Sequence, residues 1–248
     1  MDLGSPIASG NTASIYLSEG NVIKLFNDGM DRSYVLYEAN KQKSVHNSGL
    51  FVPEVLEVKQ IEGKQAILME YIEGSTLGDL CHHNMEKVER YLRISVDVQQ
   101  KVHMISTVYS LEKMTTKLTR QIESVNKLSS LQKRDLIEKM NSFSFEQKLC
   151  HGDFHLFNLI LSNEEVAIID WVDASLGDIR ADVYRTYLLY TQHSDDIAET
   201  YLRLYCESSG LSKEEIFQWA PIIAGARLSE NVATEDSDRL LEIVNQYS

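Results

Sequence analysis

The sequence predicts an α+β fold of two lobes, a small antiparallel β-sheet followed by a mainly helical region. Residues 13–26 and 52–71 are rich in β-branched and apolar residues, and each range has a Gly-containing turn at its centre, as β-hairpins do. Residues 76–149 instead have apolar side chains at helical spacing. A chain of 248 residues is long enough for one large domain or for two lobes that share a cleft.

The sequence up to residue 73 predicts a sheet with one helix. Strands at Ala13–Leu17 and Val22–Phe26 flank a turn at Glu19-Gly20-Asn21. A helix is expected from about Asp31, its N-cap, to Asn47. A second hairpin follows, with strands at residues 52–58 and 65–71. Because Gly74 relaxes the backbone at the end of the last strand, we place the boundary there, with lobes at residues 1–73 and 74–248.

The second lobe is predicted to be mostly helical. We expect one long amphipathic helix from Glu86 to Ser110, with Tyr109 on its apolar face, and further helices within residues 112–140. A later helix is expected from Arg180 to His193. A capping box at Ser212-x-x-Glu215, a kink or break at Pro221 and a last helix at Ser237–Gln246 complete the chain.

Composition limits the class of protein. A hydrophobic content of 43% and a charged content of 25% are ordinary for a soluble globular protein. No apolar run is long enough to cross a bilayer, and residues 1–11 lack the pattern of a signal peptide. The three cysteines, Cys81, Cys150 and Cys206, lack metal-site spacing and are typical of reduced thiols. We therefore expect a cytoplasmic protein without a membrane partner.

The net charge of −13 is concentrated in the second half of the chain. Residues 150–248 contain 6 Lys and Arg but 18 Asp and Glu. An acidic half argues against a nucleic-acid partner and favours a cationic one. It is equally consistent with a solvated acidic surface that aids solubility. Both interpretations stay open at the level of the sequence.

One stretch has the residue types of a phosphoryl-transfer site. Asp153 and Asn158 are five positions apart on a predicted loop, and Asp170 ends an apolar run that is typical of a buried strand. Phosphoryl transfer needs a group that orients the attacking hydroxyl and oxygen ligands that hold Mg²⁺. The stretch therefore predicts a metal-assisted phosphotransferase.

The motif His151-Gly-Asp-x-x-x-x-Asn158 followed by Ile169-Asp-Trp171 resembles the aminoglycoside phosphotransferase and choline kinase superfamily, relatives of the protein kinases. The resemblance extends from the Gly10 loop to Asp182. It implies a two-lobed protein-kinase-like fold and transfer of the ATP γ-phosphate to a hydroxyl of a small molecule. One departure is that Leu156-Phe157 occupies positions where many relatives have a proline, so the loop lacks the fixed φ of that residue.

The resemblance assigns roles to the motif residues. Asp153 orients the acceptor hydroxyl and accepts its proton, while Asn158 and Asp170 bind Mg²⁺. His151 supports the loop. Asp178 and Asp182 brace the same loop, although Asp is also common in turns and helix caps.

The resemblance also assigns residues that bind ATP. Lys24, placed by Glu38 on the next helix, contacts the phosphates, and the loop at Gly10 covers them. Main-chain groups of Glu70 and Ile72 contact the adenine. Each position has a plainer interpretation: Lys24 and Glu38 on the surface, Gly10 at a hairpin end, and residues 70–72 in an ordinary strand-to-helix loop.

Two other function classes fit part of the pattern. His151, Asp153 and His155 alternate, so on a strand they would lie on one face as metal ligands of a metallohydrolase, with Asp170 as a further ligand. That interpretation leaves Asn158 unexplained. A kinase-like fold without catalysis, which only binds a nucleotide or partner, is the third possibility.

The sequence does not fix the acceptor or the oligomeric state. Residues after Asp170 lack an Ala-Pro-Glu signature, which argues against a protein substrate. The acidic second half predicts a cationic acceptor, such as an aminoglycoside or an amino alcohol. Asp173, Glu230 and Glu235 are the candidate carboxylates for it.

Overall fold

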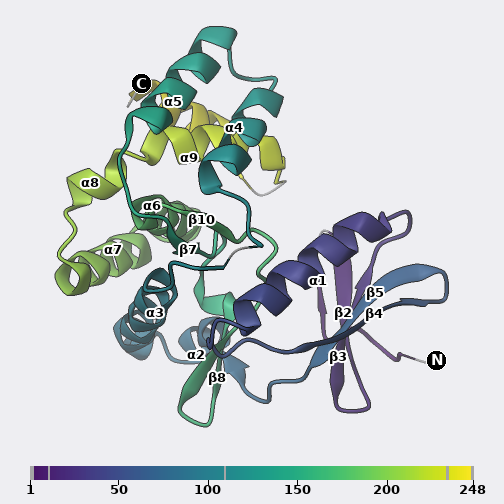
Figure 1. Cartoon of the computed structure of the whole chain (residues 1–248). Coiled ribbons are helices and arrows are strands. Elements are labelled where there is room, and N and C mark those ends of the chain that lie inside the picture. Colours follow the sequence, from purple (N-terminus) through teal and green to yellow (C-terminus); the bar gives the residue numbers. More distant parts are fainter. Residues whose placement is uncertain (1–2, 11, 109, 233–234, 247–248) are drawn as a thin grey trace. The chain divides into compact units, whose positions relative to one another are not determined.

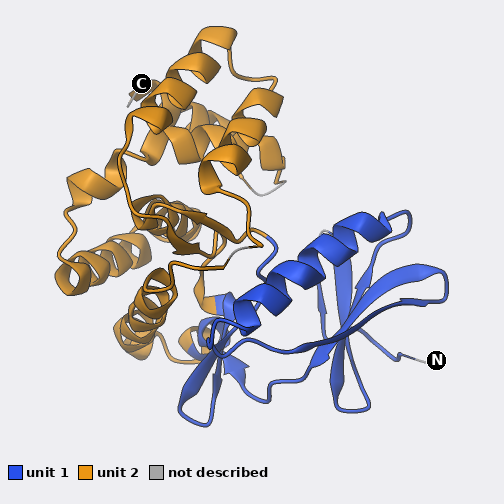
Figure 2. Cartoon of the chain, viewed as in Figure 1, with its two compact units in different colours: residues 1–80, 157–172 blue, residues 81–156, 173–248 orange. Residues whose placement is uncertain are grey.

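In a computed structural model the chain forms two compact units (Figures 1 and 2). The structure describes residues 3–10, 12–108, 110–232 and 235–246. Unit 1 comprises residues 1–80 and 157–172, and unit 2 comprises residues 81–156 and 173–248. Asn11 in the predicted phosphate loop and Tyr109 in the predicted long helix lie outside the described residues.

Unit 1 contains a five-stranded antiparallel sheet. Its strand order is β1-β2-β3-β5-β4. The strands are β1 (Ala8–Ser9), β2 (Ala13–Ser18), β3 (Asn21–Phe26), β4 (Val55–Ile61) and β5 (Lys64–Glu70). Both predicted hairpins are present, and their two-residue turns have Glu19-Gly20 and Glu62-Gly63 at positive φ. This is the backbone conformation of the type I′ turns that match strand twist.

Helix α1 (Arg32–His46) packs against one face of this sheet, as the blue ribbon in Figure 2 shows. The Asp31 side chain accepts a hydrogen bond from Ser33 N at 2.6 Å, so the predicted N-cap is confirmed. Val35 and Ala39 of α1 are fully buried against Phe26 and Ile67 of the sheet. Burial of this apolar face fixes the helix on the strands that carry the site residues.

A second, three-stranded sheet also belongs to unit 1. It has the order β6-β8-β9, with β6 at Ser75–Thr76, β8 at Leu159–Ser162 and β9 at Glu165–Ile168. Strand β9 belongs to the apolar run that was predicted to lead to Asp170 as a buried strand. Because β8 pairs with β6, the β8–β9 hairpin clusters with residues 1–80, and the compact units divide the chain differently from the predicted lobes. The functional boundary near residue 73 stays a prediction.

Unit 2 is mainly helical, with one short pair of strands, β7 (Lys148–Cys150) and β10 (Ser175–Gly177). Helix α2 (Leu77–His83) links the units, and 3-10 turns span Met85–Lys87, Leu156–Asn158 and Leu228–Glu230. The other helices are α3 (Val88–His103), α4 (Met114–Ser124), α5 (Ser130–Ser142), α6 (Ile179–Tyr190), α7 (Asp195–Ser209), α8 (Lys213–Phe217), α9 (Ala220–Arg227) and α10 (Ser237–Gln246). Trp219, Tyr201, Tyr205 and Phe154 are among the largest side chains buried in this unit.

One predicted helix is wrong in length. The expected helix from Glu86 to Ser110 ends at His103. Beyond it, Ile105 forms a main-chain hydrogen bond with β7 instead, because its carbonyl oxygen accepts from Leu149 N at 2.7 Å. Pro221 lies in the first turn of α9, where a missing N–H is tolerated, and the preceding helix α8 ends before it. The capping box at Ser212 and Glu215 is confirmed. Within the described residues, no helix is long and apolar enough to span a membrane.

Candidate functional site

Unit 1 contains an open pocket beside the sheet. Six of the predicted site residues line it: Lys24, Glu38, Glu70, Ile72, Asn158 and Asp170. Apolar side chains cover its walls, among them Ile15, Val22, Ile160 and Ile169. An apolar slot with a few charged groups at one end is the usual form of a small-molecule site.

Lys24 connects the two carboxylates in this pocket. Its Nζ lies 2.5 Å from Glu38 Oε1 and 3.4 Å from Asp170 Oδ1. Burial lowers the pKa of Lys24, but the charges of Asp170 and Glu38 outweigh it and the pKa is raised. The ammonium therefore stays charged at neutral pH.

The β8–β9 hairpin brings Asn158 and Asp170 to the same end of one ladder. Leu159 pairs with Ile168, and Ile169 N donates to Asn158 O at 3.0 Å. Asp170 follows with a φ of 63°, a left-handed conformation that is uncommon for a residue other than glycine. An amide oxygen and a carboxylate are hard ligands of the kind that Mg²⁺ prefers, so the donor set of Asn158 and Asp170 fits that ion.

Gly10 stands apart from the other predicted residues. It is exposed, does not line the pocket, and donates its N–H to Ala13 O at 2.9 Å. That N–H therefore forms a main-chain hydrogen bond at the connection between β1 and β2. The assignment of Gly10 to the phosphates stays a prediction.

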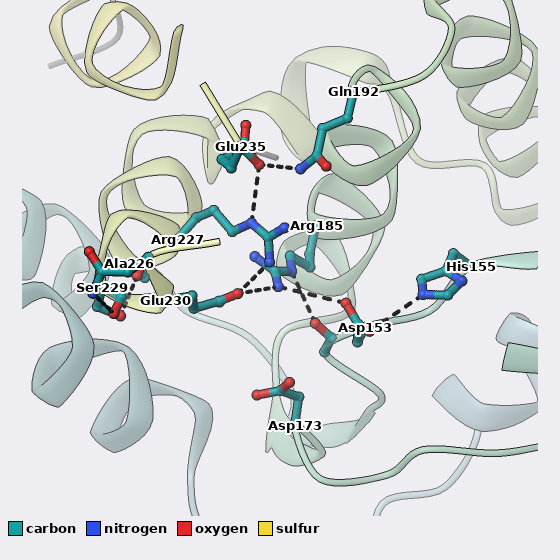
Figure 3. Close-up of polar contacts among 12 residues, drawn as sticks. Asp153, His155, Asp173, Arg185, Gln192, Ala226, Arg227, Ser229, Glu230 and Glu235 are labelled. Carbon is teal, nitrogen blue, oxygen red and sulfur yellow. Dashed lines mark hydrogen bonds and ion pairs between the residues drawn. The ribbon is translucent and has the colours of Figure 1, made fainter. Parts of the chain in front are cut away.

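Asp153 lies in unit 2, in the loop between β7 and the 3-10 turn at Leu156–Asn158. Its Oδ2 is 3.4 Å from His155 Nε2 and its Oδ1 is 3.7 Å from Arg185 Nη2 (Figure 3). Burial raises the pKa of Asp153, but the hydrogen bond with His155 and the charge of Arg185 hold it well below the usual range. The carboxylate is thus ionised at neutral pH and ready to accept a hydrogen bond.

Helix α6 holds Gly152, the residue that precedes Asp153, by its N–H and its carbonyl group. Gly152 N donates to Asp182 Oδ1 at 2.7 Å, and Arg185 Nε donates to Gly152 O at 3.1 Å. Gly152 itself has a φ of 82°, and a Cβ there would lie 2.6 Å from Asp173 O. Only glycine fits this position without strain.

A family model describes this combination of sequence features. The model of the phosphotransferase enzyme family (APH) matches residues 4–217. The chain belongs to this family.

Solved structures with the same fold include other phosphotransferases. A thermostable mutant of aminoglycoside phosphotransferase APH(4)-Ia in apo form matches with a TM-score of 0.69 and 15% identity, over 98% of this chain and 92% of that one. A choline/ethanolamine kinase family protein from Mesorhizobium loti matches at 0.63 and 14%, over 96% and 85%. Amicoumacin kinase hAmiN, in complex with AMP-PNP, Ca²⁺ and Ami, matches at 0.63 and 13%, over 99% and 86%. The predicted α+β, two-lobed protein-kinase-like fold is thereby confirmed.

A curated relative is much longer than this chain. Acyl-CoA dehydrogenase family member 10 of Mus musculus is 26% identical over 209 residues, which cover 68% of this chain and 20% of that protein. The chain therefore spans about a fifth of the length of that relative.

The metallohydrolase interpretation is not supported by the structure of this chain. Residues 151–155 form an irregular loop, so the strand that this interpretation assumes is not present. Among the described residues, the cluster with metal-ligand spacing is His103, Cys150 and Asp182, which is buried and includes none of the predicted triplet. Its imidazole already contacts Tyr205 Oη at 2.7 Å and Asp182 Oδ2 at 2.9 Å.

The three candidate acceptor carboxylates all lie next to cations in unit 2. Asp173 is 2.6 Å from Lys117 Nζ, and Glu230 contacts Arg185 at 2.9 Å and also Arg227. Asp173 and Glu230 line a pocket together with Gly152, next to Asp153, whereas Glu235 is only 4% exposed and does not line it.

Asp178, predicted to brace the loop, mainly caps α6. Its Oδ1 accepts from Arg180 N at 2.9 Å, and its Oδ2 accepts from Trp219 Nε1 at 3.0 Å. Asp182 is the residue that contacts the loop. Sequence analysis missed Arg185, although it is three positions after Asp182 on a predicted helix and must share its face.

Proposed function

We propose that this phosphotransferase transfers the γ-phosphate of Mg²⁺-bound ATP to a hydroxyl of a small molecule. The observation that carries the proposal is the position of Lys24, which contacts Glu38 and Asp170 at the polar end of an apolar pocket. A cation fixed between two carboxylates, with an Asn and an Asp that suit Mg²⁺, is the arrangement that phosphoryl transfer requires.

The apolar walls of the pocket suit the adenine. Its flat ring fits between Ile15 and Val22 on the sheet and Ile160 and Ile169 on the β8–β9 hairpin, with main-chain groups of Glu70 and Ile72 at its edge. Lys24 then holds the phosphates. Asn158 and Asp170 would hold Mg²⁺, which would supply positive charge to the phosphates.

Asp153 acts on the acceptor. With its pKa held below the usual range it is a weak base, so we propose that it first orients the hydroxyl and accepts the proton late in the transfer. Positioning of this kind provides most of the catalysis in phosphoryl transfer, because the reaction needs little covalent participation by the protein.

We further propose a cationic acceptor that carries an ammonium group. Beside Gly152, the carboxylates of Asp173 and Glu230 are 33% and 24% exposed, whereas their partners Lys117, Arg185 and Arg227 are 12%, 8% and 7% exposed. A ligand that enters the pocket therefore meets carboxylate oxygens, with the cations behind them. Exposed carboxylates in a cleft attract amines.

The compartment and the acceptor class of the proposal each have their own support. The three cysteines are free thiols, which supports a reducing compartment such as the cytoplasm. The solved structures of APH(4)-Ia with ADP and hygromycin B, and of amicoumacin kinase hAmiN with AMP-PNP, Ca²⁺ and Ami, support a hydroxylated small molecule as the acceptor class.

An ADP-release assay tests the function. The purified protein is incubated with ATP and Mg²⁺ and with aminoglycosides, choline, ethanolamine and neutral sugars, and Asp153→Asn serves as the control. We expect acceptor-dependent ADP release, with kcat about 10²–10⁴-fold lower in Asp153→Asn and the KM of ATP nearly unchanged. Nucleotide binding without turnover on any compound would instead indicate a binding module.

A further inference from the structure

The Arg185 guanidinium in unit 2 contacts three groups at once. Its Nε donates to Gly152 O at 3.1 Å, and its Nη2 lies 2.9 Å from Glu230 Oε2 and 3.7 Å from Asp153 Oδ1 (Figure 3). The side chain is only 8% exposed. A guanidinium is planar, and its donors point in fixed directions, so its position constrains all three partners together.

Helix α6 thereby fixes the peptide groups on both sides of Gly152 in the catalytic loop. Asp182 accepts from the N–H of Gly152, and Arg185, one helical turn later, donates to its carbonyl. Asp182 is itself held by His103 at 2.9 Å and Gln99 at 3.2 Å. The backbone of the loop is thus fixed by α6, and Arg185 alone among these residues also contacts the Asp153 carboxylate.

Glu230 connects the same guanidinium to the proposed acceptor pocket. Glu230 lines that pocket, and it is shared between Arg185 and Arg227, which in turn contacts Glu235 at 3.2 Å. A ligand that contacts Glu230 is therefore connected to Asp153 through Glu230 and Arg185.

We propose that Arg185 is a positioning residue that orients Asp153 and links it to Glu230 in the acceptor pocket. This inference rests on the proposed function, since it assumes that Asp153 receives the acceptor hydroxyl. A purely structural ion pair would stabilise α6 in the same way but would leave the environment of Asp153 unchanged. The two roles therefore differ in what they do to the carboxylate.

The first test measures the Asp153 carboxylate directly, without any acceptor. Side-chain ¹³C signals of labelled Asp are titrated in the wild type, Arg185→Gln and Arg180→Gln, and Asp153→Asn assigns the signal. Arg180 is the matched control, because it forms a partly buried pair with Asp178 on the same helix. The groups that face Asp153 are His151, His155, Asp173 and Arg185.

We expect the Asp153 pKa to rise in Arg185→Gln and to stay at the wild-type value in Arg180→Gln. An unchanged Asp153 titration in Arg185→Gln, or an equal rise in both variants, would overturn the proposal. This readout does not depend on turnover, so it judges Arg185 even if no compound in the panel is phosphorylated, an outcome that would count against the proposed function alone.

The second test uses turnover with whichever aminoglycoside or amino alcohol supports ADP release. Arg185→Gln should lower kcat about 10–100-fold, as expected for a misplaced reacting group, with the KM of ATP within about twofold. Arg185→Lys keeps the charge and should recover part of kcat. Glu230→Gln leaves Arg185 in place and should raise the acceptor KM. Parallel loss of stability and kcat in Arg185→Gln and Arg180→Gln would mean that Arg185 has only a structural role.

Discussion

At the scale of the residue, Lys24 keeps its positive charge inside unit 1 because it is paired with two carboxylates. Its side chain is only 14% exposed, and an isolated buried ammonium would tend to lose its proton. Glu38 and Asp170 reverse this tendency. The Lys24–Glu38 pair was predictable from the strand-then-helix order, but the contact with Asp170, 146 positions later, has no local signal in the sequence.

A double-mutant cycle checks whether Lys24 and Glu38 act as a unit. Lys24→Ala should weaken ATP use strongly, and Glu38→Ala should do so less, because it only displaces the lysine. If they cooperate, the double mutant should be little worse than Lys24→Ala, with a coupling energy of about 0.5–3 kcal/mol in kcat/KM for ATP. Fully additive losses would mean that the two residues act independently.

The metal ligands are tested by the Mg²⁺ dependence of the rate. Asp170→Ala removes a charged ligand and Asn158→Ala a neutral one, so both should lower activity and raise the Mg²⁺ concentration at half-maximal rate, Asp170→Ala more strongly. Asp28→Ala, which removes an exposed carboxylate that does not line the pocket, is the control. Three Mg²⁺ titration curves that coincide with the wild type would rule out this assignment.

At the scale of the element, the two hairpins of the large sheet and the bounds of α1 and α10 were predicted well, whereas the C-terminal end of α3 was not. The β8–β9 hairpin follows from a turn of polar residues between two apolar runs, and both Asn163 and Glu164 in that turn have positive φ. The end of α3 at His103 depends on a main-chain contact with Leu149, distant in sequence, which periodicity cannot reveal.

Gly74 offers a test of how tightly β6 and β8 are joined. A Cβ at Gly74 would lie 2.2 Å from Leu161 O, so the two strands would have to separate. Gly74→Ala should lower the free energy of unfolding by about 1–3 kcal/mol in chemical denaturation and raise the KM of ATP, because Gly74 also lines the pocket.

Gly10→Ala is the matched control for this measurement. A Cβ there meets only Ala13 O at 3.8 Å, and the main-chain N–H is kept. Its free energy of unfolding should stay within about 0.5 kcal/mol of the wild type. If Gly74→Ala were as stable as Gly10→Ala, the close approach of β6 and β8 would not be a constraint on the fold.

At the scale of the whole molecule, the charge of −13 is a poor guide to the local sites. The predicted carboxylates Asp173, Glu230 and Glu235 each contact a Lys or Arg, and Glu235 is buried. The sequence indicates an acidic half, but not that Arg185 and Arg227 of that half, together with Lys117 from outside it, lie behind these carboxylates. Tertiary pairs such as Arg185 with Glu230 form between positions 45 apart and become visible only in the structure.

The salt dependence of KM distinguishes carboxylates in the acceptor pocket from the general acidic surface. Screening is strong beyond about 8 Å at physiological ionic strength, so only carboxylates in the acceptor pocket affect a bound amine. The KM of a cationic acceptor should rise with NaCl more than the KM of ATP does, and the difference should shrink in Asp173→Asn. A neutral best acceptor whose KM does not depend on salt would show that the acidic surface only aids solubility.

The most direct test of phosphoryl transfer to a small molecule is the identity of the product. In ³¹P NMR of the wild type with ATP, Mg²⁺ and the acceptor panel, we expect a phosphomonoester signal that grows in proportion to ADP, and almost no such signal with Asp153→Asn. ATP that stays intact with every compound, or ADP that appears with inorganic phosphate alone at equal rates in both proteins, would contradict the account.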